Sequence, residues 1–224
     1  MTIRTLGCLA ALACVPTALG DVYSDAIGDI AVGNANLDIT QVEVTHDADN
    51  LYMTVSLNGW EDWTKLLVFM DAGSGSATSG TNNPWGRAIS TDWEFNDFYG
   101  TYFDDGDFAQ DWNYNGSEWG LTISRTVAVD RGAATVMYTF SQTSLGIGEG
   151  DTISFDVATT GGNGGDPGID LASTSTVQPS WGEGTSQSIN PLTYTLGGST
   201  PVVPGVGGLV ALAGIGFAGR RRSR

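Results

Sequence analysis

Apolar and polar residues alternate with a period of two along much of the chain, a pattern that predicts β-strands. Residues 51–57 are the clearest case, because the odd positions are all apolar while the even positions carry Tyr, Thr and Ser. The same alternation predicts strands at residues 42–44, 121–123, 136–140 and 153–157. Residues 65–71 (KLLVFMD) are almost continuously apolar, which indicates a strand in the centre of a sheet.

Turn-forming residues separate the predicted strands. They occur at residues 46–50 (HDADN), 115–116 (NG), 130–132 (DRG) and 146–150 (GIGEG). Short strands at this spacing are typical of an antiparallel sandwich of two β-sheets. We therefore predict an all-β protein in which residues 21–196 form a single β-sandwich domain without an internal repeat.

The first twenty residues have the composition of an export signal, so we predict a signal peptide at residues 1–20. A basic start (MTIR) precedes a short apolar stretch, and the small residues ALG form a cleavage site before Asp21. A lipoprotein signal ending at Cys14 is the alternative. Both cysteines of the chain, Cys8 and Cys14, lie in this segment, so the exported domain must rely on its hydrophobic core rather than on disulfides.

The other end of the chain has the features of a membrane segment. After a linker at residues 197–204, residues 205–224 form an apolar stretch that ends in a cluster of arginines. From Val202 to Gly219 there is no charge, and eighteen residues of helix would span about 27 Å, close to the hydrocarbon thickness of a bilayer. The arginines that follow would hold the end of this helix on the cytoplasmic side.

This ending, VPGVGGLVALAGIGFAGRRRSR, resembles the PEP-CTERM sorting signal of bacterial surface proteins. That signal consists of a short proline motif, here Pro204 and Gly205 without the usual glutamate, then an apolar helix and basic residues, here Arg220, Arg221 and Arg222. The resemblance implies an exosortase-like processing enzyme that removes the tail. The domain would pass the inner membrane transiently and reach the cell surface or the extracellular matrix. A permanent single-pass anchor is the alternative.

The domain itself is strongly acidic. The segment from Asp21 to Glu183 holds all 25 acidic residues of the chain and only four basic ones, a formal charge of −21 (4 basic minus 25 acidic residues). This charge repels nucleic acid and anionic lipid, and it suits cations or neutral ligands. Asp outnumbers Glu by 19 to 6, and Asp is common in turns and in metal-binding loops.

Four segments of the domain form a recognisable set: DAIGD at residues 25–29, LDI at 37–39, DNLY at 49–52 and GDTISFDV at 150–157. Together they resemble carbohydrate-binding-module family 9 and DOMON-like β-sandwiches. The resemblance implies the same sandwich fold. Domains of this kind commonly bind sugars or calcium, and some serve only as structural units of surface proteins.

Aromatic residues point to a ligand. Eleven of the 22 aromatics lie between Trp85 and Trp119, interspersed with Asp, Asn and Gln. Flat rings and hydrogen-bonding side chains are the mixture that a sugar-binding face needs, although most Phe and Tyr rings at alternating positions are expected in the core. Tryptophans beside Gly, Asn or Pro are the better candidates, and Trp60 and Trp63 are possible additions. The predicted ligand-binding residues are Trp85, Trp93, Asp97, Trp112 and Trp181.

Calcium is the one cofactor that the sequence suggests. Asp25, Asp29 and Asp38 lie near the first predicted strands and could converge as oxygen ligands. A second acidic turn, DDGD at residues 104–107, likewise lacks the ordered spacing of an EF-hand loop. Zinc sites built from His and Cys are excluded, because the exported domain has one histidine and no cysteine.

Catalysis is not expected. No nucleophile-elbow motif or phosphate-binding glycine loop occurs, and His46 is the only histidine. We predict an exported, non-catalytic binding domain at the cell surface or in the matrix, with an extracellular polysaccharide as its ligand. Two alternatives remain: a structural matrix protein with calcium-dependent cohesion and no small ligand, or a glycoside hydrolase that uses a pair of carboxylates.

Overall fold

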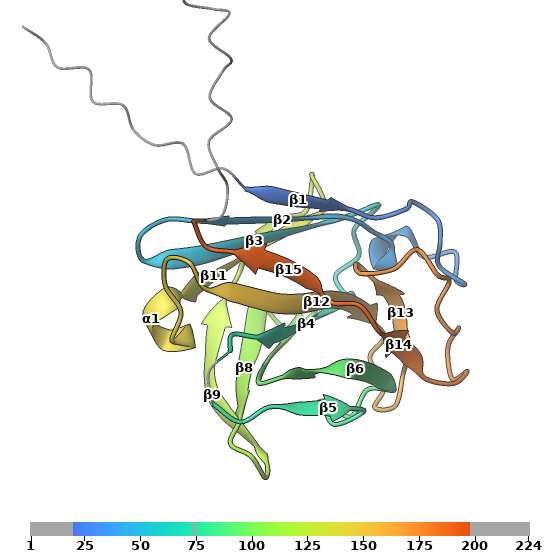
Figure 1. The fold of residues 1–224 in the computed structure, drawn as a ribbon. Coiled ribbons are helices and arrows are strands. Elements are labelled where there is room, and N and C mark those ends of the chain that lie inside the picture. Colours follow the sequence, from blue (N-terminus) through green and yellow to red (C-terminus); the bar gives the residue numbers. More distant parts are fainter. Residues whose placement is uncertain (1–19, 74, 198–224) are drawn as a thin grey trace, which may run out of the picture.

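The computed structural model describes residues 20–73 and 75–197 (Figure 1). The predicted signal peptide, apart from Gly20, and the sorting residues Pro204, Gly205, Arg220, Arg221 and Arg222 lie outside the described residues. Within the described ranges, no helix is both long enough and apolar enough to cross a membrane. The described residues form a mostly β structure with two large sheets, as the alternation predicted.

The first large sheet has five strands, all paired antiparallel, and lies at the top of Figure 1. Its order is β1 (Asp21–Ser24), β2 (Ile39–His46), β3 (Asn50–Leu57), β11 (Thr135–Ser141) and β10 (Ala128–Asp130). In β3 the odd positions Leu51, Met53 and Val55 are fully buried, so the predicted apolar face is the core face.

The second large sheet has seven strands, again paired antiparallel throughout. Its order is β13 (Gly168–Leu171), β12 (Thr152–Thr160), β4 (Lys65–Asp71), β7 (Asp97–Tyr102), β8 (Phe108–Tyr114) and β9 (Trp119–Thr126), with β15 (Leu192–Thr195) also paired to β12. The continuously apolar strand β4 lies inside this sheet, between β12 and β7, as predicted.

A third, smaller sheet departs from the predicted two-sheet sandwich. Its order is β14 (Ser186–Ser188), β6 (Ile89–Phe95) and β5 (Thr78–Gly80), and β14 pairs with β6 in parallel. The reason lies in β4, whose adjacent residues are buried on both faces of the sheet and therefore need cover on both sides. Leu67 and Phe69 belong to a second hydrophobic cluster with Ile89 and Phe95 of β6.

The main core fills the space between the two large sheets. Its members include Val55 and Tyr138 from the five-stranded sheet, and Val68 and Val157 from the seven-stranded sheet. The Tyr138 hydroxyl lies 2.8 Å from that of Thr101 on β7, so the one polar group of this large buried side chain has a partner. A contiguous core of this size replaces the disulfides that the domain lacks.

Two short helical turns complete the described fold. The turn η1 (Ala35–Leu37) precedes β2, and α1 (Gln142–Leu145) follows β11 directly. Helix α1 is capped at its start by Ser141, whose side chain accepts a hydrogen bond from the backbone N–H of Ser144, and at its end by Gly146, whose φ is 70°. A left-handed residue at this position favours glycine, which explains part of the predicted GIGEG turn.

Candidate functional site

Two of the seven tryptophans are more exposed to solvent than the other five. Trp63 is 37% exposed and Trp181 is 38% exposed, whereas the others are partly buried against the core clusters. Four of these five use the indole N–H in a hydrogen bond: to Asp62 (Trp60), Gln110 (Trp85), Ser188 (Trp93) and Asn82 (Trp119). Packing and hydrogen bonding therefore account for four of these side chains. Trp112 packs against the second hydrophobic cluster, but its shielded indole N–H has no partner within the described residues. Trp63 and Trp181 remain open to a ligand.

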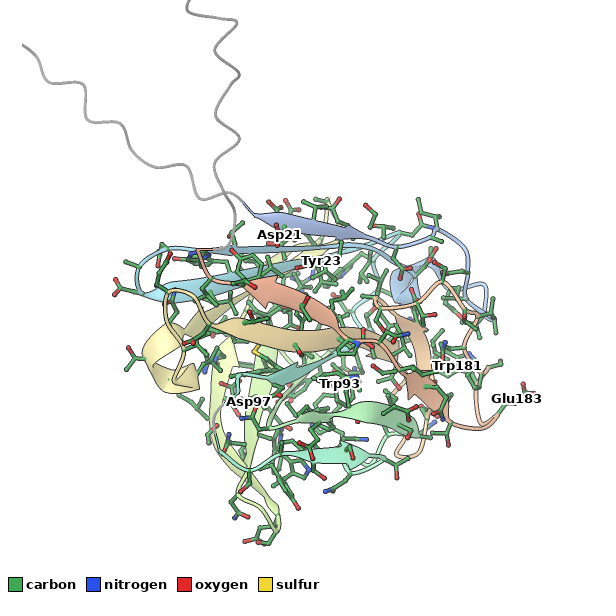
Figure 2. All side chains as sticks on the ribbon, in the orientation of Figure 1. Asp21, Tyr23, Trp93, Asp97, Trp181 and Glu183 are labelled. Atoms are coloured by element: carbon green, nitrogen blue, oxygen red, sulfur yellow. The ribbon has the colours of Figure 1, made fainter. Side chains whose placement is uncertain are left out.

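The two exposed indoles meet although 118 positions separate them in the sequence. Trp63 lies in the connection between β3 and β4. Trp181 lies in the connection between β13 and β14 and is labelled in Figure 2. Their ring centroids are 6.4 Å apart, with 57° between the ring planes. Gly161 makes room for Trp181, because a Cβ atom there would lie 2.6 Å from the indole. We call Trp63 and Trp181 the tryptophan pair.

A hollow of about 490 Å³ lies beside the tryptophan pair, and Trp63 is part of its wall. The other lining residues are Gly33, Asn34, Ala35, Asn36, Gly59, Trp60 and Glu61. Trp60 is held in place, since its ring packs 4.9 Å from that of Phe103 and the Arg131 guanidinium lies 5.4 Å from its centroid. The hollow thus combines aromatic rings, one of them held in place by its neighbours, with amide and carboxylate groups.

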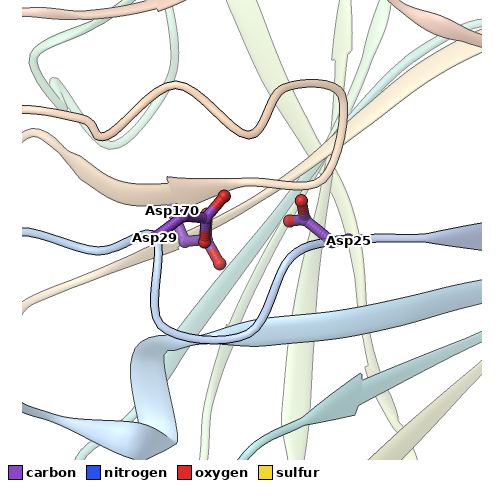
Figure 3. Close-up of side chains that lie close together, drawn as sticks. All are labelled: Asp25, Asp29 and Asp170. Carbon is purple, nitrogen blue, oxygen red and sulfur yellow. The ribbon is translucent and has the colours of Figure 1, made fainter.

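A second feature is a cluster of three carboxylates, the acidic triad of Asp25, Asp29 and Asp170 (Figure 3). One carboxylate oxygen from each lies within 4.8 Å of those of the other two. Asp25 and Asp29 come from the loop after β1, and Asp170 comes from β13 at the edge of the seven-stranded sheet. The triad therefore joins residues near the start of the domain to a strand that lies about 140 residues further along the chain.

The triad is electrostatically strained in the absence of a cation. Burial, together with the neighbouring carboxylates of the triad, raises the pKa of Asp25 to about 7 and that of Asp170 to about 8. Burial also raises the pKa of Asp29. Both oxygens of Asp29 and Oδ2 of Asp25 are shielded from solvent, with no hydrogen-bond partner in any other described residue. A bound cation would satisfy these oxygens and remove the repulsion.

Asp170 is fixed in place by the backbone. Its Oδ2 accepts a hydrogen bond of 2.6 Å from the N–H of Ile39, and its Oδ1 accepts one of 2.9 Å from the N–H of Leu171. Each oxygen keeps lone pairs for a metal, because a carboxylate oxygen accepts more than one interaction. The residues present therefore suit a hard cation with oxygen ligands, such as Ca²⁺.

Of the three predicted metal ligands, the structure brings together Asp25 and Asp29 but places Asp38 outside the triad. Asp38 is 1% exposed and accepts hydrogen bonds from the backbone N–H of Gly28 and from the side-chain amide of Asn58. It thus shapes the loop that carries Asp29, and its charge acts on Asp25 and Asp29 from outside.

The predicted ligand-binding residues do not form one site. Trp85, Trp93 and Trp112 pack against the second hydrophobic cluster, and Trp112 lies within strand β8 rather than in a loop. Trp181 is in the tryptophan pair, and Asp97 lies at a pocket between β9 and α1 that also includes Trp112. Figure 2 shows Trp181 and Asp97 at well-separated places in the fold.

Sequence reasoning missed Asp170 and gave Trp63 only a secondary place. A signal for Asp170 exists in the IDLA segment, where a carboxylate interrupts a buried apolar strand. No protein-family model matches the chain, and no curated protein is detectably similar to it. Its function is therefore inferred from the residues and geometry described above.

Proposed function

We propose that this protein is an exported, non-catalytic glycan-binding domain of the cell surface or matrix, whose fold is tightened by a calcium ion. The tryptophan pair carries this proposal. Two large indoles, each more than one third exposed, lie together beside a hollow that contains amide and carboxylate groups. Such a surface suits the apolar C–H face of a sugar ring, with hydrogen-bonding groups for its hydroxyls.

The net charge supports a neutral ligand. The formal charge of the chain is −16, so an anionic polymer such as nucleic acid would be repelled. A neutral polysaccharide meets no such barrier, and stacking on indoles needs no charge. The partial exposure of both indoles also suits a segment within a long polysaccharide chain, which needs a surface rather than an enclosed pocket.

Calcium has a structural role in this proposal. Ca²⁺ takes six to eight oxygen ligands, so the acidic triad would supply part of the set and water or backbone carbonyls the rest. The ion would fasten the loop after β1 to β13. Because the triad lies within one chain, this role differs from calcium-dependent cohesion between chains, the alternative raised by the sequence.

Binding of polysaccharides to the purified domain (residues 21–196) tests the glycan proposal. With calcium present, a glycan array should yield hits that are lost in Trp63→Ala and in Trp181→Ala. Val177→Ala is the matched control, because Val177 is 56% exposed in the same connection as Trp181 but is not part of the pair. An array without hits, or hits that survive both tryptophan substitutions, would contradict the proposal.

The alternatives predict other outcomes. Self-association on calcium addition without sugar binding would support a structural matrix protein, and sugar turnover that depends on a carboxylate would support a hydrolase. Export and C-terminal sorting are proposed from the sequence alone. Surface labelling of intact cells should reach the domain, and full-length protein found only in the cytosol would contradict export.

A further inference from the structure

Strand β9 differs from the other strands that lie at the edge of a sheet. The edge strands β1, β10, β13, β15, β14 and β5 are four residues long or shorter, whereas β9 (Trp119–Thr126) has eight residues. Within the described residues β9 pairs only with β8, so its other side has no ladder partner. Proteins usually keep edge strands short, charged or covered, because an open edge pairs readily with another strand.

The side chains of β9 are as open as its backbone. Residues 120–124 are all exposed, and they include the large aliphatic side chains of Leu121 (50% exposed) and Ile123 (54%). Leu121 pairs with Trp112 of β8, and Ile123 pairs with Asp111. Neighbouring residues of a strand point to opposite faces and cross-strand partners share a face, so the two aliphatic side chains flank the open edge on both faces of the sheet.

A β-bulge shapes the middle of this edge. The pairing of β8 with β9 shifts register between Asp111 and Trp112, which leaves Thr122 as the extra residue of β9. A bulge bends and twists its strand, so a straight partner strand would fit β9 poorly. A second copy of β9, laid antiparallel, carries the same bend at its own middle. The shape of the edge therefore matches itself.

Charge favours the same partner. Residues 119–129 contain no carboxylate, and Arg125, the one charged residue of β9, is paired with Asp111 of its own chain. A basic strand would find no carboxylate on β9 to bind, and the formal charge of −16 on the chain would repel an acidic strand. An uncharged strand meets neither obstacle, and β9 is itself such a strand. Two copies would thus approach where their mutual repulsion is weakest.

We infer that β9 is an interface between two copies of this domain, which pair antiparallel about a two-fold axis near Thr122. The ladder would join the two seven-stranded sheets into one continuous sheet and give the open backbone groups of each β9 a partner. Leu121 and Ile123 of both copies would lose exposed apolar surface. Because each β9 contacts the other, the assembly closes at two copies and does not grow into a fibre.

Pairing would make the domain bivalent, a consequence that rests on the proposed glycan binding. In Figure 1, β9 lies at the left of the view and β13 and β14, whose connection carries Trp181, lie at the right. Both tryptophan pairs would therefore stay free in the dimer. Two linked modules that engage one polymer together bind it about 100-fold to 10,000-fold more tightly than one module does.

Sedimentation velocity of the exported domain in the presence of a calcium chelator tests the pairing. We expect a monomer–dimer equilibrium that becomes severalfold tighter in about 0.5 M salt, because salt screens the repulsion between two acidic copies. Ile123→Lys should weaken the dimer at least tenfold, since it places a charge at the open edge. Val22→Lys is the matched control, because Val22 is also 54% exposed and lies on the short edge strand β1. Melting curves check that both variants fold.

Cysteine cross-linking locates the interface, since the exported domain has no cysteine of its own. Opposite residues of an antiparallel ladder have Cα atoms about 4.5–5.5 Å apart, which a disulfide can bridge. Thr122→Cys, near the proposed axis, should therefore give a disulfide-linked dimer at least tenfold faster than Val22→Cys on mild oxidation. Equal rates for the two variants would contradict pairing through β9.

Several results would overturn the inference. They are a protein that stays monomeric at every concentration, a dimer that survives Ile123→Lys, and assemblies that grow beyond two copies. Slow hydrogen exchange of the β9 amides in the monomer would also overturn it, because another segment would then cover the edge.

The interface and the glycan proposal can fail separately. Trp181→Ala should abolish polysaccharide binding and leave the dimer intact. Ile123→Lys should instead lower the affinity for a long polysaccharide while a short oligosaccharide binds as before. A dimer without any glycan binding would keep the interface and contradict only the proposed function.

Discussion

Two acidic sites in this domain compensate for the burial of carboxylates in opposite ways. Asp156, on β12, is fully buried and accepts hydrogen bonds from the N–H groups of Val157 and Ser173 and from the hydroxyls of Ser173 and Ser188. The acidic triad instead leaves three of its shielded oxygens without a partner in any other described residue. A carboxylate whose oxygens all have donors needs no cation, whereas a cluster with unpartnered carboxylate oxygens is stabilised by one.

The largest expected effect on stability comes from the substitution of Asp156. Asp156→Ala should lower the free energy of unfolding by about 3 kcal/mol, because it strands the Ser173 and Ser188 hydroxyls and their neighbouring N–H groups in the interior. In calcium-free buffer, Asp29→Asn should change this free energy by no more than about 0.5 kcal/mol or raise it, because Asn removes a repelled charge. Chemical denaturation of both variants measures the contrast. Equal losses in the two would remove the distinction between the sites.

Calcium should have the next largest effect. At about 100 times its dissociation constant, Ca²⁺ should stabilise the domain by about 2.7 kcal/mol, which raises the melting temperature by roughly 5–10 °C. The same addition should leave Asp29→Asn unchanged, while Glu183→Gln, which alters an exposed carboxylate, should respond like the wild type. Thermal melting with calcium, magnesium or chelator checks this. A full calcium response in Asp29→Asn would exclude the triad as the site.

The pH dependence sharpens the same comparison. In the metal-free domain the raised pKa values of Asp25, about 7, and Asp170, about 8, mean that the folded state holds protons which the unfolded chain has already released. The contribution of these two groups to stability is therefore greatest below their unfolded pKa of about 4 and is lost as the pH rises towards 8.

Calcium competes with these protons, so the gain in melting temperature on adding calcium should grow between pH 5 and pH 8. Burial also raises the pKa of Asp156 to about 6, and its titration contributes with and without calcium, so the difference between the two conditions reports mainly on the triad. Melting curves across this range measure the trend. A calcium gain that stays constant or shrinks with rising pH would be inconsistent with binding at the triad.

The smallest effect is expected at Asp38. Asp38→Asn should weaken calcium binding by no more than about tenfold, because this side chain orients the loop through Gly28 and Asn58 without joining the triad. Isothermal titration calorimetry measures the affinity. Complete loss of binding would instead place Asp38 among the ligands, as the sequence alone suggested.

The sequence predicted the β architecture well because alternation reports which face of a strand is buried. Residues 51–57 and 65–71 became β3 and β4 with the expected burial. The third sheet was not foreseen, since the pairing of β14 with β6 brings together segments nearly 100 residues apart. Alternation says that a strand has a buried face, but it does not say which distant segment covers that face.

The sites were harder to predict for the same reason. Asp25 and Asp29 lie four residues apart, so their proximity could be read locally, but Asp170 joins them only through the position of β13 at the edge of its sheet. The dense aromatic segment around Trp93 and Trp112 drew attention because of its composition. Much of it proved to be the cover of the second hydrophobic cluster, whereas Trp63 and Trp181 meet through folding.

The acidic triad joins distant parts of the chain, so calcium around the protein would affect how stable the fold is. If the domain is exported as proposed, a calcium ion that joins Asp25 and Asp29 to β13 could bind only after nearly the whole domain has crossed the membrane and folded. Calcium is scarce in cytosol and plentiful in many extracellular fluids, so an ion held with the modest affinity of extracellular modules would lock the domain after secretion. The newly made chain would then stay looser, and easier to translocate, until it arrives where it works.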